Sequence, residues 1–137
     1  MNYKTYEVKE YSNGTIEYYK DGKLHREDDK PAIERFNGDK EWYLFDEFHR
    51  ENGPAVIFAN GEKRWFKDGK FHREDGPAVI FANGNVQYYL NNIYYYTEED
   101  YYNKLNGIKK CNVNVIKSYN IKGKLVSEDT ISIQCNF

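Results

Sequence analysis

Two thirteen-residue stretches of this chain are almost identical, and this repetition constrains the fold more than any other feature. Residues 49–61 read HRENGPAVIFANG and residues 72–84 read HREDGPAVIFANG, so they differ only at Asn52 and Asp75. The glycines of successive Asn-Gly pairs, which are Gly14, Gly38, Gly61 and Gly84, lie 24, 23 and 23 residues apart. A fixed period of this length is typical of proteins built from stacked units. The sequence therefore predicts a structural repeat rather than a doubled active site.

Within each repeat, turns divide the chain into short extended pieces and leave no room for a helix. In residues 54–76 the predicted strands are residues 55–58, 63–66 and 71–73. Asn60-Gly61 predicts a two-residue hairpin turn, in which both central residues take positive φ. Asp68-Gly69 predicts the next turn, and in the second repeat we expect that turn at Asp46-Glu47.

The fourth repeat loses the pattern near its end, where a short helix is predicted. Thr97 suits the N-cap, and the two glutamates that follow would lie in the first turn, where acidic side chains favour a helix. Gly107 suits the position just beyond the last turn. We expect a helix over residues 98–105 that closes the end of the stack, because terminal repeats often need a capped outer face.

Three stretches carry a resemblance to a known family: YYKDGKLHRED (18–28), WYLFDEFHRENGPAVIFANG (42–61) and WFKDGKFHREDGPAVIFANG (65–84). They resemble the MORN-variant class of β-hairpin repeats, of the HREDGPA type found in large DNA viruses, phages and some bacteria. The ending YYLNNIYYYTEEDYYNK (88–104) resembles that family's exit into a short helix. The resemblance implies an all-β fold, in which stacked β-hairpin repeats of about 23 residues form one elongated twisted sheet. Because most functions in the family are unassigned, the resemblance assigns no functional residue.

Residues 108–137 lie outside the resemblance and are predicted to form a hairpin about Gly123, packed on or beside a repeat domain of residues 1–107. The expected cross-strand pairs are Ile121–Leu125, Lys117–Asp129, Val115–Ile131, Val113–Ile133 and Cys111–Cys135. These pairs match apolar with apolar residues and cation with acid. A second turn at residues 127–129 is the alternative, and it would give three short strands. In that hairpin register the cysteines could form a disulfide, but a reducing cytosol would keep them as thiols.

Charge is divided unevenly along the chain. Residues 1–102 hold 14 basic and 20 acidic residues, a net charge of −6, whereas residues 103–137 hold 6 lysines and 2 acids, a net charge of +4. An acidic repeat region argues against binding duplex DNA along its surface. No apolar run approaches the roughly 20 residues of a membrane span, and the start lacks a signal-peptide core. We expect a soluble cytoplasmic protein without membrane contact, in a host cell if its source is a virus or phage.

His-Arg-Glu recurs once in each of three repeats, and its first two residues are His25, Arg26, His49, Arg50, His72 and Arg73. We interpret these six as a structural ladder, in which His or Arg stacks on Trp or Tyr while Glu pairs with Arg. Acid–base chemistry is the alternative, because histidine titrates near neutral pH, but it needs one special copy. A metal site would need a second ligand beside each histidine. We therefore expect no enzyme, no catalytic or metal-binding residue and no cofactor.

The expected interaction surface combines tyrosines of the last repeat with lysines of the C-terminal hairpin: Tyr88, Tyr89, Tyr94, Tyr95, Tyr96, Lys109, Lys110, Lys117, Lys122 and Lys124. Alternate residues of a strand face opposite sides, so one tyrosine of each pair should be exposed, either as an interface contact or as padding for a thin sheet. We expect a non-enzymatic protein that docks on another protein, for example a viral, phage or mobile-element inhibitor of a host defence system such as an anti-CRISPR protein. The alternative is a sponge for a nucleotide second messenger, gripped by arginines and aromatics, and single-stranded RNA is a further candidate ligand.

Overall fold

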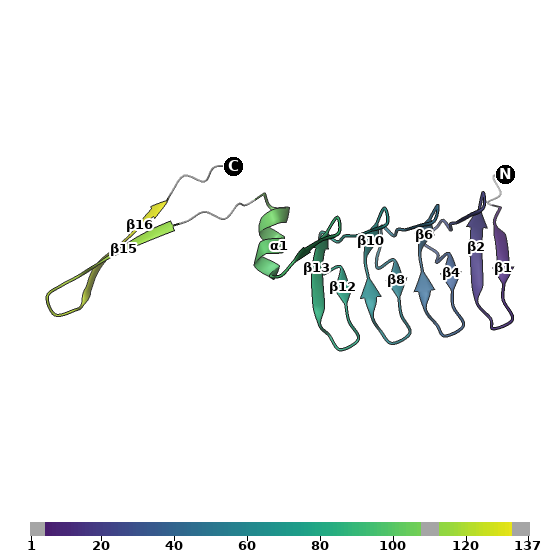
Figure 1. Cartoon of the computed structure of the whole chain (residues 1–137), viewed down its shortest axis with the longest axis horizontal. Coiled ribbons are helices and arrows are strands. Elements are labelled where there is room, and N and C mark those ends of the chain that lie inside the picture. The colour runs from purple at the N-terminus through teal and green to yellow at the C-terminus, as the bar shows by residue number, and fades with distance from the viewer. Residues whose placement is uncertain (1–4, 108–112, 133–137) are drawn as a thin grey trace. The chain divides into compact units, whose positions relative to one another are not determined.

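The computed structural model describes residues 5–107 and 113–132. They divide into two compact units, the first ending at Tyr101 and the second beginning at Tyr102, and we call the first unit the body. The division falls inside the only helix of the described residues, earlier in the chain than the boundary expected after residue 107. The fold is all-β, with antiparallel hairpins stacked side by side in the body (Figure 1), as the sequence predicts.

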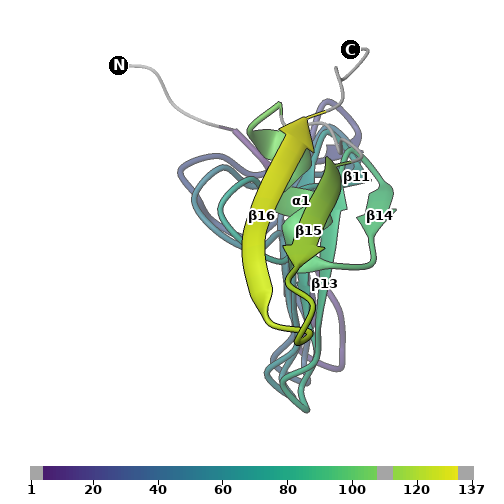
Figure 2. The same ribbon diagram turned by 90° about the vertical axis from the view of Figure 1, so that its left-hand side faces the viewer.

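The body contains fourteen strands among its described residues: β1 (Glu7–Glu10), β2 (Ile16–Lys20), β3 (Lys23–Leu24), β4 (Ile33–Glu34), β5 (Lys40–Glu41), β6 (Tyr43–Leu44), β7 (Glu47–Phe48), β8 (Val56–Ile57), β9 (Lys63–Arg64), β10 (Phe66–Lys67), β11 (Lys70–Phe71), β12 (Val79–Ile80), β13 (Val86–Leu90) and β14 (Ile93–Tyr95). The main sheet runs in the order β1-β2-β4-β5-β8-β9-β12-β13-β14, with β3 paired to β2. Two separate ribbons, β6–β7 and β10–β11, accompany it. Viewed along the stack in Figure 2, the hairpins of successive repeats lie behind one another.

The first hairpin of each repeat closes with a four-residue turn, which we call the tip turn. In the third repeat the amide of Gly61 donates to the carbonyl of Phe58 at 3.0 Å, and Asn60 accepts the amide of Glu62 through Oδ1 at 2.9 Å. Only Gly61 has positive φ, at 93°, so the prediction of positive φ at both Asn60 and Gly61 is wrong. The asparagine side chain stabilises a type I turn, and the glycine after it takes the left-handed conformation that lets the chain rejoin the strand.

The second hairpin of each repeat closes with a two-residue turn of type I′, which we call the short turn. Asp68 and Gly69 form it in the third repeat, with φ of 49° and 75°. In the second repeat it lies at Phe45 and Asp46, with φ of 47° and 67°, so the expected position Asp46-Glu47 is wrong. Glu47 instead belongs to β7, where it pairs with Leu44. The carboxylate of Asp46 accepts the amide of Leu24 in the preceding repeat at 2.7 Å, which holds Asp46 at the turn.

The chain changes partners between the two hairpins at a tryptophan. The amide of Trp65 donates to the carbonyl of Ala78 in the next repeat at 2.7 Å, while its carbonyl accepts the amide of His72 in its own repeat at 3.2 Å. The strand expected over residues 63–66 is therefore divided into β9 and β10. Trp42 makes the same exchange in the second repeat, so each inner repeat pairs first with its neighbour and then with itself.

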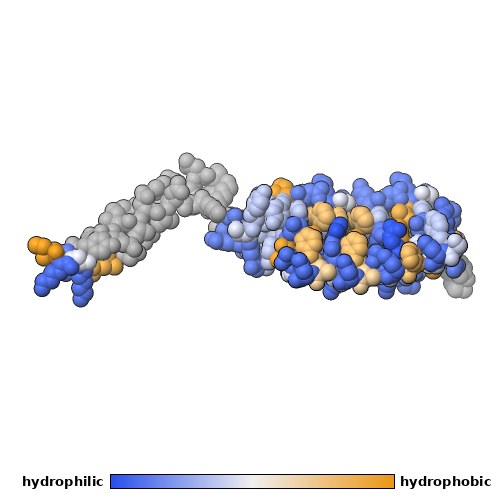
Figure 3. All heavy atoms as spheres, turned by 60° about the horizontal axis from the view of Figure 1, so that its bottom comes forward, coloured by the Kyte–Doolittle hydropathy of each residue, from blue (hydrophilic) through white to orange (hydrophobic). Residues whose placement is uncertain are grey.

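The core of the body is thin and consists mainly of one small and one β-branched residue from each repeat. Ala32, Ala55 and Ala78 are fully buried, and Ile33, Val56 and Val79 beside them are nearly so. Small side chains let neighbouring strands and their aromatic rings approach closely, at a modest gain in buried apolar area. On the face that Figure 3 presents, hydrophobic side chains are spaced along the body among hydrophilic ones.

The helix α1 (Glu98–Leu105) has the predicted bounds. Thr97 caps it, because its Oγ1 accepts the amide of Asp100 at 3.1 Å. Gly107, with φ of 67°, follows its end. The buried Tyr101 anchors α1 to the body, since its hydroxyl donates to the carbonyl of Arg73 and accepts the amide of Gly76 at 3.3 Å.

The second unit contains one hairpin, formed by β15 (Val113–Tyr119) and β16 (Leu125–Ser132), so the three-strand alternative is wrong. Its register differs from the expected one by one residue along most of the hairpin: Val113 pairs with Ser132, Val115 with Thr130 and Lys117 with Glu128. At Tyr119, which pairs with Leu125, the difference is two residues. The cause is a tip-like turn in which the amide of Gly123 donates to the carbonyl of Asn120 at 2.9 Å, together with a register shift between Ser118 and Tyr119. A shift of one residue exchanges the two faces of a strand. The expected pairs of Ile121, Lys117, Val115 and Val113 are therefore wrong, since Val113 pairs with Ser132. The expected Cys111–Cys135 pair lies outside the described residues.

Candidate interaction surfaces of the repeats

The three histidines make equivalent contacts between repeats. Through Nδ1, His25, His49 and His72 accept the amides of Phe45, Asp68 and Asn91, at 3.2, 3.1 and 3.0 Å. Each donor is the first residue of the next repeat's short turn. Because Nδ1 accepts a hydrogen bond, the ring hydrogen is on Nε2, which lies 3.5, 2.8 and 3.3 Å from the carboxylates of Glu27, Glu51 and Glu74. Each ring is therefore held in one tautomer and joins two repeats.

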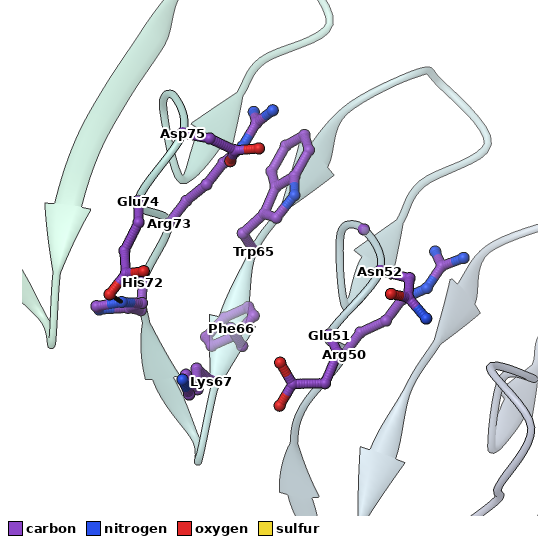
Figure 4. Close-up of a pocket in the computed structure, with 11 residues that line it drawn as sticks. Arg50, Glu51, Asn52, Trp65, Phe66, Lys67, His72, Arg73, Glu74 and Asp75 are labelled. Atoms are coloured by element: carbon purple, nitrogen blue, oxygen red, sulfur yellow. Dashed lines mark hydrogen bonds and ion pairs between the residues drawn. The ribbon is translucent and has the colours of Figure 1, made fainter.

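The three arginines also make equivalent contacts. The guanidinium groups of Arg26, Arg50 and Arg73 lie 3.6, 3.9 and 3.9 Å from the ring centres of Tyr18, Trp42 and Trp65. Each also donates to a proline carbonyl, of Pro31, Pro54 or Pro77, at 3.1 Å. The structure differs from the expected pairing of Glu with Arg, because the Glu of each motif lies against its histidine. Figure 4 shows this arrangement for Glu74 and His72, and it shows Arg73 alongside Trp65.

One arginine links two repeats through a carboxylate. Arg50 donates from Nε and Nη2 to both oxygens of Asp29 in the preceding repeat, at 2.7 and 3.1 Å. These hydrogen bonds, together with the positive charge, hold the pKa of the Asp29 carboxyl below its ordinary value of 3.8. Paired charge-assisted bonds of this geometry also fix orientation.

A row of aromatic rings, which sequence reasoning missed, crosses the last three repeats. It consists of Tyr43, Phe48, Phe66, Phe71, Tyr89, Tyr94 and Tyr96, and we call it the aromatic row. Successive ring centres lie between 4.2 and 5.2 Å apart, within the range of favourable ring contacts. The signal was present in the sequence, because an aromatic residue recurs with the 23-residue period at two positions of each of the last three repeats.

The aromatic row ends in exposed residues at the last strand of the sheet. Ile93 is 57% exposed, Tyr94 is 37% exposed and Tyr96 is 87% exposed, and we call these three residues the end patch. The other predicted tyrosines lie further in: Tyr88 contacts Tyr101, Tyr89 belongs to the aromatic row, and Tyr95 is half-buried.

The predicted lysines belong to the second structural unit or to undescribed residues. Lys122 and Lys124 are exposed at the turn of the β15–β16 hairpin, and Lys117 lies in β15 opposite Glu128. Lys109 and Lys110 lie outside the described residues. The structure therefore does not bring the lysines and the tyrosines together in one compact unit.

Grooves of mixed charge lie between successive repeats. The larger, of about 590 Å³, lies between the second and third repeats (Figure 4). Its lining includes three cationic side chains and three carboxylates, which are Arg50, Lys67, Arg73, Glu51, Glu74 and Asp75. A similar groove of about 270 Å³ lies between the first and second repeats. The carboxylates offset the positive charge that would attract a phosphate.

Within the described residues, no group of three or more His, Cys, Asp or Glu side chains is arranged to hold a metal ion. No helix in the same part of the chain is long and apolar enough to cross a membrane. Comparisons with protein-family models, with curated proteins and with solved structures found no match to this chain.

Proposed function

We propose that this chain is a non-enzymatic interaction protein that docks on another protein through the end patch. The observation that carries the proposal is the exposure of Ile93, Tyr94 and Tyr96 at the end of the stack, where a repeat protein ordinarily needs a polar face. At the positions equivalent to Ile93 and Tyr96, the third repeat has Lys70 and Arg73. Exposed tyrosines next to an aliphatic side chain are typical of protein interfaces.

The opposite end of the stack supports this proposal by contrast. Strand β1 exposes three charged side chains, Glu7, Lys9 and Glu10, around one exposed apolar residue, Val8. The ammonium group of Lys9 lies 4.3 Å from the ring centre of Tyr19, so that ring is covered. Charged side chains on an edge strand discourage association with other chains. The two ends therefore differ in the way expected if only the β14 end binds a partner.

The hydrogen bonds of the histidines argue against acid–base catalysis. A histidine that acts as a base needs a free ring nitrogen, but in each repeat Nδ1 accepts a backbone amide and Nε2 faces a glutamate. Because the three copies share these contacts, each is explained by its role in holding the repeats together.

A nucleotide sponge is the less supported alternative. Its ligand would bind in the groove beside Arg50, Trp65 and Arg73, where three carboxylates offset the charge of the two arginines and Lys67. The resemblance to repeats of viruses and phages makes bacterial defence complexes, such as CRISPR effectors, the first protein partners to test.

The test is a binding comparison between variants of the full chain and immobilised candidate effectors. The double variant Tyr94→Ser/Tyr96→Ser should weaken binding at least tenfold, because it removes two exposed aromatic contacts. The control Phe36→Ser changes a residue that is 68% exposed at a tip turn, and it should bind as the wild type does. Equal affinity for the double variant and the wild type would exclude the end patch as the docking surface.

A further inference from the structure

Each of the first three repeats receives the short turn of the next repeat through the same backbone contacts. The carbonyls of Leu24, Phe48 and Phe71 accept the amide of the turn's second residue, which is Asp46, Gly69 or Asn92, at 2.9, 3.0 and 2.9 Å. The amide of Phe71 also donates to the side chain of Asn92 at 2.7 Å, as that of Leu24 does to Asp46. These contacts define a docking position for a turn, repeated three times along the body.

An aromatic ring accompanies the docked turn in the later repeats. Phe66, which lies two residues before the short turn of the third repeat, stacks on Phe48 with ring centres 4.8 Å apart. Tyr89, which lies two residues before the next short turn, stacks on Phe71 at 5.0 Å. The docked element is thus a type I′ hairpin turn with an aromatic residue two positions before it.

Tyr94 occupies the fourth of these docking positions. Leu90 and Ile93 flank the two-residue turn of the last repeat and form a hydrogen-bonded pair. Hydrogen-bonded and non-hydrogen-bonded pairs alternate along an antiparallel hairpin, so the next pair, Tyr89 and Tyr94, exchanges no hydrogen bonds. The amide and carbonyl of Tyr94 therefore point away from β13. The amide and carbonyl of Phe71, at the equivalent position of the third repeat, are directed in the same way and contact Asn92 of the next repeat. Outside the pairing of β13 with β14, no described residue forms a hydrogen bond with either group of Tyr94.

We propose that the end patch binds a type I′ β-hairpin turn of a partner protein that carries an aromatic residue two positions before the turn. The turn's second amide donates to the carbonyl of Tyr94, and the partner's aromatic ring extends the aromatic row. Ile93 and Tyr96 provide apolar surface on either side of the docked turn, at positions where the inner repeats carry charged residues. This inference rests on the proposed function and specifies the chemistry of the partner.

A second copy of this chain fits the position less well than a different protein. The short turn of the first repeat, Asp21-Gly22, has the required φ values of 53° and 77°, and Tyr19 precedes it by two residues. However, β1 pairs along Tyr19 and Lys9 lies over its ring, so the ring that would meet Tyr94 of another copy is already covered.

The last repeat also differs from the inner ones in a way that affects affinity. Tyr95 replaces the histidine whose Nδ1 would accept the amide of the turn's first residue. The partner's turn is therefore held by the backbone of Tyr94 and by ring contacts. Binding should accordingly depend strongly on the Tyr94 ring.

The test is a titration of the ¹⁵N-labelled full chain with a backbone-cyclised peptide that carries residues 65–72, WFKDGKFH, as its hairpin. Saturable amide shifts should centre on Tyr94 and its neighbours. Tyr94→Ala should weaken binding at least tenfold, and so should replacing the peptide's first phenylalanine by alanine. The control Val8→Lys changes an exposed residue at the opposite end and should leave the affinity unchanged.

Ile93→Lys serves as a second variant if Tyr94→Ala does not fold, because it introduces the residue that the third repeat has at the equivalent position, Lys70. Ile93→Lys should also weaken binding of the peptide. Absence of saturable shifts at millimolar peptide, or wild-type affinity in the folded variants, would overturn the inference. Self-association of the chain that is abolished by Tyr94→Ala would also overturn it, since a second copy would then be the occupant. If the peptide binds at Tyr94 but no protein partner depends on the end patch, the proposed function fails and the turn-binding site stands.

Discussion

The histidine contacts predict a graded loss of stability when His25 and His72 are replaced by alanine. His25 is 2% exposed, accepts the amide of Phe45 and lies 4.1 Å from the Phe45 ring centre. Loss of a buried acceptor costs about 1–3 kcal/mol and loss of a ring contact about 0.5–1.5 kcal/mol, so His25→Ala should cost about 2–4 kcal/mol. The side chain of His72 is 11% exposed and accepts an exposed amide that water can reach. His72→Ala should therefore cost only about 0.5–1.5 kcal/mol.

Urea unfolding followed by circular dichroism measures both losses, because a lower midpoint at constant slope reports lower stability. His25→Asn is the matched control, since asparagine Oδ1 is attached to the same side-chain carbon as histidine Nδ1 and can accept the Phe45 amide. It should retain part of the stability that His25→Ala loses. Equal losses for His25→Ala and His72→Ala, or no recovery with asparagine, would refute the assigned role of Nδ1.

Three further outcomes follow from the fold. Gly84→Val should destabilise the body by about 1–2 kcal/mol or more because Gly84 has a φ of 88°, whereas Asn85→Val should cost less, and thermal melting distinguishes the two. The pKa of Asp29 is lowered by Arg50, so its contribution of about 0.2–1 kcal/mol is present above pH 3.8 and is lost as the pH falls through the lower folded pKa. When the pH is lowered, Asp29→Asn should not show this loss of stability. An acid-unfolding profile equal to that of the wild type would contradict the prediction. Deletion of residues 108–137 should leave the body folded and able to bind its partner, and loss of binding in the folded truncation would assign recognition to the C-terminal hairpin.

Periodicity made the repeat architecture predictable, but it did not determine the type of each turn. The positions of Gly61 and Gly84 located the tip turns, yet the residue pair alone did not distinguish a two-residue loop from a type I turn followed by glycine. Phe45 was not expected in a left-handed turn, because aromatic residues rarely adopt that conformation. It does so because a hydrogen bond and a ring contact with His25 compensate for the strain.

The candidate site was only partly predictable for a related reason. Tyr94 and Tyr96 were expected at an interface from their residue type, but Ile93 was not, since its exposure depends on the sheet ending at β14. The β15–β16 register was one residue off because matching charges and apolar residues cannot determine the length of the loop at Asn120.

The most direct measurement is hydrogen exchange of the full chain at single-amide resolution, with and without its protein partner. If the end patch is the docking surface, the amide of Tyr94, which points away from β13, should exchange more slowly in the complex, together with its neighbours in residues 93–96. The amides of the tip turns, such as that of Ala59, should exchange at unchanged rates. Protection confined to residues 120–125 or to the tip turns, with Tyr94 unaffected, would contradict docking at the end patch.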